Sequence, residues 1–147
     1  MTNEQLINTV NRIRLRSIIY KNPAVETPQI GLIDFDDSTI ENAIIGSFLE
    51  NFKEAQALFE FLITDTFYTF ENQLIFKIMI HLFSESEAIN YSTVTQQLER
   101  NKNLAILLGE GGTLYLKFLK NNALSEAQIE FINSKIGNNC LIYANEN

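Results

Sequence analysis

The fold of this chain is decided by the stretch Ser38-Thr-Ile-Glu41-Asn-Ala-Ile44-Ile45-Gly46-Ser-Phe48-Leu49. Its large apolar residues recur every three or four positions, which places them on one side of an α-helix. Ser38 and Glu41 have the spacing of a capping box, in which the serine oxygen accepts from the third helical amide and the glutamate accepts from the serine amide. The stretch therefore predicts a helix that begins at residue 38 and buries one face.

The same spacing continues along nearly the whole chain, so the sequence predicts an all-α protein. With 147 residues, one main domain is expected. We divide the chain into an N-terminal extension (1–37, helix 3–21 plus a linker rich in Pro, Gly and Asp), a helical domain (38–137) and a C-terminal tail (138–147). Within the domain, the further helices are expected at 53–63, 69–83, 92–100, 113–120 and 126–136.

Local signals refine three of these helices. Ser125 and Gln128 repeat the capping-box spacing at the start of the last helix, and Gly137 has the place of a glycine that ends it. In the first helix, Leu6, Val10 and Ile13 form an apolar stripe that is expected to pack on the body or on a neighbouring subunit. The chain has eleven Phe and five Tyr but no Trp, so we expect phenyl rings to fill much of the core.

Charge and cysteine content narrow the functional classes. The net charge is −7, but residues 1–33 carry +2 and the remainder −9. Because an acidic body is repelled by phosphate backbones, proteins are more suitable partners for it than nucleic acid. The single cysteine, Cys140, forms no internal disulfide, which favours a reducing compartment and hence the cytoplasm. A signal peptide and a membrane span are not expected.

Three groups of residues could belong to a metal site, a phosphate-binding loop or a calcium loop, but each lacks residues that such a site needs. His81 has no second histidine or cysteine at ligand spacing, so we expect a structural histidine and no metal. The cluster Gly109-Glu-Gly-Gly112 lacks the Lys-Ser/Thr pair of a phosphate-binding loop and is interpreted as a turn. Asp34, Asp36 and Asp37 lack the later ligands of a calcium loop. The sequence therefore predicts a protein without catalytic site, metal or cofactor.

A second function class depends on the basic residues of the first helix. Arg12, Arg14 and Arg16 are candidate phosphate contacts, and Arg12 and Arg16 lie four residues apart on one helical face. A solvated face is the simpler interpretation of the same residues. The alternative function is a small helical nucleic-acid-binding protein that uses this helix.

Several short motifs in order resemble the N-terminal domain of DnaB-type replicative DNA helicases. The family has a Glu-Gln-x-Val-Leu-Gly helix, an Asp-Phe-Tyr turn, a His-x-x-Ile-Phe helix, a Pro-Ile-Asp element and a Gly-Gly-x-x-Tyr-Leu helix. The corresponding residues here are Ile40-Glu41-Asn-Ala-Ile44-Ile45-Gly46, Thr66-Phe67-Tyr68, Asn72-Gln73-Leu74-Ile75-Phe76, Ala88-Ile89-Asn90, Val94, Leu98-Glu99-Arg100, and Gly111-Gly112-x-x-Tyr115-Leu116. The resemblance covers residues 38–136.

The resemblance implies a fold and a role. The fold is a small globular helical domain followed by an antiparallel helical hairpin. The role is self-association as a dimer or trimer of dimers in the helicase collar, with docking of the primase C-terminal domain or another replisome protein. The family's linker helix and ATPase domain are absent from the 147 residues, so we expect either a fragment of a helicase or a stand-alone copy of its first domain.

The residues also suggest where such a domain would associate. Leu114, Tyr115, Phe118 and Leu119 make helix 113–120 apolar on nearly every side, and such a helix needs cover from more than one direction. Phe131 points away from the apolar stripe of helix 126–136, its expected hairpin partner. These five residues are the predicted two-fold interface.

Overall fold

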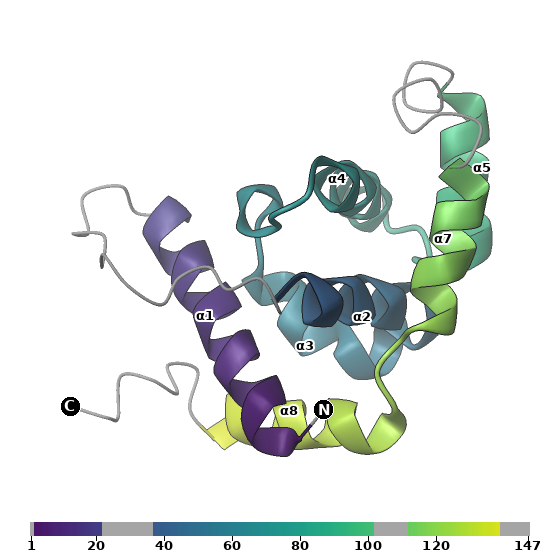
Figure 1. The fold of residues 1–147 in the computed structure, drawn as a ribbon. Helices are drawn as coiled ribbons and strands as arrows, with labels where there is room; N and C mark the ends of the chain where they lie inside the picture. The colour runs from purple at the N-terminus through teal and green to yellow at the C-terminus, as the bar shows by residue number, and fades with distance from the viewer. Residues whose placement is uncertain (1, 22–36, 102–111, 139–147) are drawn as a thin grey trace.

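The computed structural model describes residues 2–21, 37–101 and 112–138, and these ranges contain helices and no strand (Figure 1). The all-α prediction is therefore confirmed. None of the described helices is long and apolar enough to cross a bilayer. The helices are α1 (Asn3–Lys21), α2 (Asp37–Glu50), α3 (Phe52–Phe61), the 3₁₀ turn η1 (Thr64–Thr66), α4 (Phe70–Ser84), α5 (Tyr91–Arg100), α7 (Gly112–Asn121) and α8 (Glu126–Asn138).

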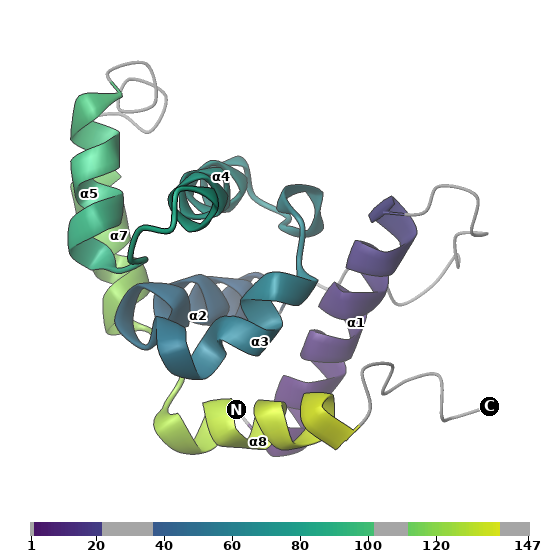
Figure 2. The same ribbon diagram turned by 180° about the vertical axis from the view of Figure 1, so that it is seen from behind.

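Helix α2 is the centre of the molecule. It contacts α1, α3, α4, α5 and α7, and the apolar residues of the quoted stretch are all 5% exposed or less. Figures 1 and 2 show α4 on one side of the α2–α3 pair and α8 on the other, with α1 at one end and α5 and α7 at the opposite end. The stretch that predicts the fold is thus the one on which the other helices pack.

Phenylalanine rings fill the core between α2, α3 and α4. The ring centroid of Phe59 lies 5.3 Å from that of Phe48 and 5.0 Å from that of Phe76, and Phe67 lies 4.9 Å from Phe76. The first pair is edge-on and the other two are tilted, arrangements that aromatic rings prefer over a face-to-face sandwich. This core accounts for the phenylalanine-rich composition.

The helix ends agree with the sequence at one site and differ at two. At α8 the Ser125 amide donates to Gln128 Oε1 (2.9 Å) and the Gln128 amide donates to Ser125 Oγ (3.1 Å), so this capping box is confirmed. The capping box predicted at Ser38 is wrong, because both oxygens of Glu41 accept from groups elsewhere, and α2 begins at Asp37. Gly137 lies inside the last turn of α8 and does not follow it.

The expected hairpin of residues 113–120 with 126–136 is not formed. Helix α7 packs on α2 and α5, whereas α8 packs on α3 and α1, and the two run in different directions in both views (Figures 1 and 2). The Leu124 amide donates to Ser47 Oγ (2.9 Å), which ties the turn before α8 to α2. Within α8, Ile129 and Ile132 are buried beside Ala55 and Leu58 of α3. The antiparallel neighbour of α7 is α5.

Helix α1 shares the core of the domain. Leu6, Val10 and Ile13 are fully buried and belong to the same cluster as the apolar residues of α2 and α8. The stripe therefore packs on the body of its own chain. The linker residues 22–36, the glycines at 109–111 and the tail residues 139–147 lie outside the described residues.

Candidate protein-interaction surfaces

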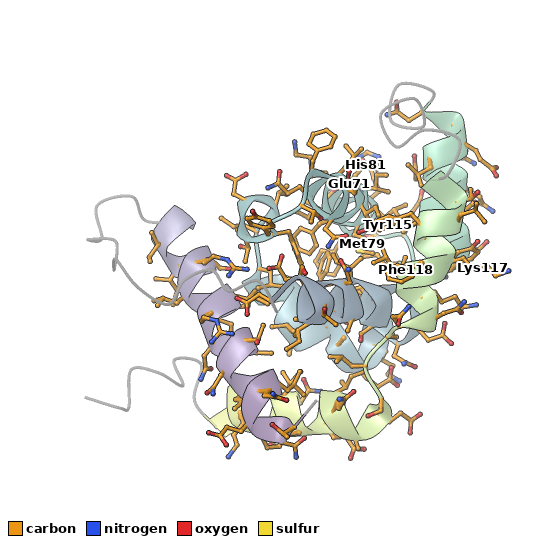
Figure 3. All side chains as sticks on the ribbon, in the orientation of Figure 1. Glu71, Met79, His81, Tyr115, Lys117 and Phe118 are labelled. Carbon is orange, nitrogen blue, oxygen red and sulfur yellow. The ribbon has the colours of Figure 1, made fainter. Side chains whose placement is uncertain are left out.

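The predicted interface on α7 divides into an outer and an inner side. Leu114 is 70% exposed and Phe118 49% exposed, while Leu119 is fully buried. Tyr115 is half-buried and stacks on Phe118, with ring centroids 6.2 Å apart. In Figure 3, Tyr115 and Phe118 lie on the side of α7 nearer α4 and Lys117 lies on the other. Leu114 and Phe118 are thus available to a partner, and Leu119, contrary to its prediction, is not.

Phe131 is not part of the same surface. It is half-buried on α8 and packs against the core, and the Lys135 ammonium lies 5.6 Å from the centre of its ring. Since α8 packs on α3 and α1, Phe131 and the outer side of α7 belong to different parts of the molecule. The structure does not bring the five predicted interface residues together.

A buried polar cluster fixes the position of α7. The Tyr115 hydroxyl donates to Asn72 Oδ1 of α4 (2.7 Å), and Asn72 Nδ2 donates to Asn42 Oδ1 of α2 (2.7 Å). Asn72 is fully buried. Burial raises the pKa of the Tyr115 hydroxyl above its ordinary value, so it stays protonated as a donor. This cluster was not predicted; its one signal in the sequence is an asparagine within the apolar stripe of α4.

Other large apolar residues are exposed around α4. Tyr68 and Phe70, at the start of this helix, are 62% and 54% exposed, and Ile80 and Phe83, near its end, are each 40% exposed. In the motif Thr66-Phe67-Tyr68, Phe67 enters the core and Tyr68 faces solvent. None of these four residues was predicted to lie on the surface, because a local pattern does not show which apolar side chains the core leaves uncovered.

His81 lies in a groove between α4 and α5. The groove has a volume of about 280 Å³ and is lined by Leu74, Lys77, Ile78, His81, Gln97 and Asn101. His81 itself is exposed. No group of three His, Cys, Asp or Glu side chains arranged to hold a metal ion is found within the described ranges. The groove offers one imidazole and one ammonium group beside two amides, without a nucleophile and base in contact.

The arginines of α1 face protein carboxylates and rings. Arg12 and Arg16 bind carboxylates of α2, and the guanidinium carbon of Arg14 lies 4.5 Å from the ring centre of Phe61. Arg14 and Arg16 are 2% exposed or less. Phosphate contact by these two residues would require them to leave the core, so the structure disfavours the nucleic-acid alternative.

Comparison with known proteins identifies the class. Residues 35–137 match the family model described as the DnaB-like helicase N-terminal domain, and the chain belongs to this family. It is 28% identical over 103 residues to the replicative DNA helicase DnaB of Rhodothermus marinus. That match covers 70% of this chain and 11% of the relative, so the chain spans a small part of the length of the helicase it resembles. No solved structure matches the chain significantly.

Proposed function

We propose that this chain is a non-catalytic interaction and oligomerisation module of a replicative DNA helicase. The observation that carries the proposal is the pair Leu114 and Phe118, two large apolar side chains that are exposed on a helix whose opposite side is buried in the core. Contiguous apolar surface of this kind marks protein contacts. Membership in the DnaB-like N-terminal family supports the same role.

The position of Leu114 and Phe118 on a firmly packed helix suits an interface. They lie four residues apart and so share one face of α7. Leu116 and Leu119 are fully buried on the other face, and the Tyr115–Asn72 hydrogen bond fixes the helix against α4. A preorganised apolar pair loses little conformational freedom when a partner covers it. The two-fold contact that we propose is therefore centred on Leu114 and Phe118.

The assembly and the partner follow from the family. We propose that the chain forms a dimer, or a trimer of dimers, in the collar of the helicase, and that the collar docks the C-terminal domain of the primase or another replisome protein. This role places the protein in the cytoplasm and requires neither metal nor cofactor from these residues. ATP-driven unwinding would belong to a parent helicase if this chain is a fragment of one.

The oligomeric state tests the proposal. Leu114→Asp and Phe118→Asp should each convert a dimer, measured by light scattering at micromolar concentrations, into a folded monomer with unchanged helical circular dichroism. Thr113→Asp is the matched control, since it adds the same charge at the neighbouring exposed position. A monomeric wild-type protein, or Asp variants of unchanged mass, would place the interface elsewhere.

A further inference from the structure

Two carboxylates of α2 are buried beneath α1. Asp37 and Glu41 are each 1% exposed and lie one helical turn apart. Arg12 binds Asp37 side-on through Nε (3.1 Å) and Nη2 (2.5 Å). Arg16 Nη2 donates to Glu41 Oε2 (2.8 Å), and its Nη1 donates to Asp37 Oδ2 (3.4 Å). Two arginines four residues apart on one helix are thus matched to two carboxylates four residues apart on another.

The 3₁₀ turn η1 completes the polar part of this contact. Arg16 Nε donates to the carbonyl oxygen of Thr66 (3.1 Å), and Ser17 Oγ and Thr66 Oγ1 are 2.7 Å apart. The apolar stripe of α1 lies toward its N-terminal end. An amphipathic helix that binds in a groove lays its apolar face into that groove. Helix α1 contacts α8 as well as α2 and η1. The α2–η1 face, with α8 beside it, therefore meets both the charged and the apolar residues of α1, as a helix-docking site would.

The body beneath α1 has an aromatic centre between α2, α3 and α4, and it carries the opposite charge to α1. The rings of Phe48, Phe59 and Phe76 pack on one another there, and the apolar residues of α1 extend the same buried cluster. The family match begins at residue 35 and leaves α1 out. Residues 1–33 carry a charge of +2 and the remainder −9. Helix α1 is thus a basic element outside the family match, packed on an acidic body.

We propose that the α2–η1 face is a docking site for a helix that carries two arginines four residues apart, and that α1 fills it as an exchangeable ligand. The α1 of one copy can then seat on the body of a second copy. Residues 22–36 connect α1 to α2, and a connector of this length spans at most about 50 Å when extended. This inference goes beyond the proposed function and does not depend on the α7 interface.

The test uses the full chain with a protease site inserted between residues 24 and 33 and cleaved after folding. We expect the cleaved α1 fragment to co-elute with the body, which keeps its helical circular dichroism. A fluorescent peptide of residues 1–21 should then exchange into the cleaved protein and raise the fluorescence anisotropy. The peptide with Arg16→Gln should bind about 100-fold more weakly, because it leaves buried carboxylate charge unpaired.

A second peptide controls for net charge. Asn8→Glu lowers the peptide's charge by the same amount as Arg16→Gln but changes an exposed residue. Its affinity should therefore stay within about threefold of that of the native peptide. Loss of the body's helical signal after cleavage would show that α1 is an inseparable core element and would overturn the proposal. Failure of the native peptide to exchange, or equal binding by the Arg16→Gln peptide, would overturn it as well.

Discussion

The hydroxyl of Tyr115 donates to the amide oxygen of Asn72 across 2.7 Å, and this bond joins the helix with the exposed apolar pair to the helix that covers the aromatic core. The two residues are 43 positions apart in sequence. Asn72 is in turn bonded to Asn42 of α2. Three helices therefore meet at one buried polar cluster, and the orientation of α7 depends on it.

Tyr115→Phe should destabilise the protein by about 1–3 kcal/mol, since it removes the donor and leaves the buried Asn72 oxygen poorly satisfied. Urea unfolding followed by circular dichroism measures the effect. Tyr68→Phe is the matched control, because Tyr68 is 62% exposed, and its effect should stay within about 0.5 kcal/mol. Equal effects of the two substitutions would mean that the Tyr115 bond contributes nothing to stability.

Gly46→Ala should destabilise the protein, although alanine is favoured over glycine in an open helix by about 1 kcal/mol. A Cβ at residue 46 would overlap the carbonyl oxygen of Leu119, so α7 would have to move away from α2. We expect a net loss of about 1–3 kcal/mol, as in overpacked cores. Thermal unfolding gives the sign directly, and a stabilised variant would mean that the two helices do not approach this closely.

The ionisation of Glu41 should make the protein less stable as the pH rises. Burial is the main cause that raises the pKa of Glu41 in the folded protein, although the Tyr68 amide and Arg16 act in the opposite direction. The folded state therefore holds a proton that the unfolded chain releases near its ordinary pKa of 4.5. This contribution is fully present below that pH and is lost as the pH rises through the folded-state pKa.

The measurement for Glu41 compares the wild-type protein with Glu41→Gln. The free energy of unfolding of the wild type, minus that of the variant, should fall as the pH increases from below 4.5 toward neutrality. Subtraction of the variant removes the contributions of the other titrating groups. A difference that grows with pH would show that the Arg16 ion pair outweighs the cost of burial.

The protein should not bind Mg-ATP. Its glycine cluster is followed by Thr113-Leu114 in place of the Lys-Ser/Thr pair that reaches the phosphates and magnesium. Isothermal titration calorimetry should give only heats of dilution. Saturable binding at micromolar concentration would contradict the proposal of a non-catalytic module.

Short-range patterns in the sequence predicted most of the helices, and they singled out Leu114 and Phe118, which the structure leaves exposed. The ranges of α3, α4, α5, α7 and α8 agree with prediction to within two residues at each end, and the capping box of Ser125 and Gln128 is formed. Each depends on residues at most four positions apart. The exposed position of Leu114 also follows from an apolar helix that has more apolar sides than one core can cover.

The sequence by itself determined which residues form helices and which faces are apolar, because backbone hydrogen bonding and helical periodicity act between near neighbours. Only the tertiary structure decided which faces meet. Burial of an apolar stripe is favourable against any other apolar stripe, so the stripe itself does not select its partner. The packing of α7 on α5 and of α8 on α3 therefore depends on how all the helices fit together. The same holds for Arg16, whose partner Glu41 lies 25 residues away: charge pairing over such distances depends on the packing of the helices, and no local pattern encodes it.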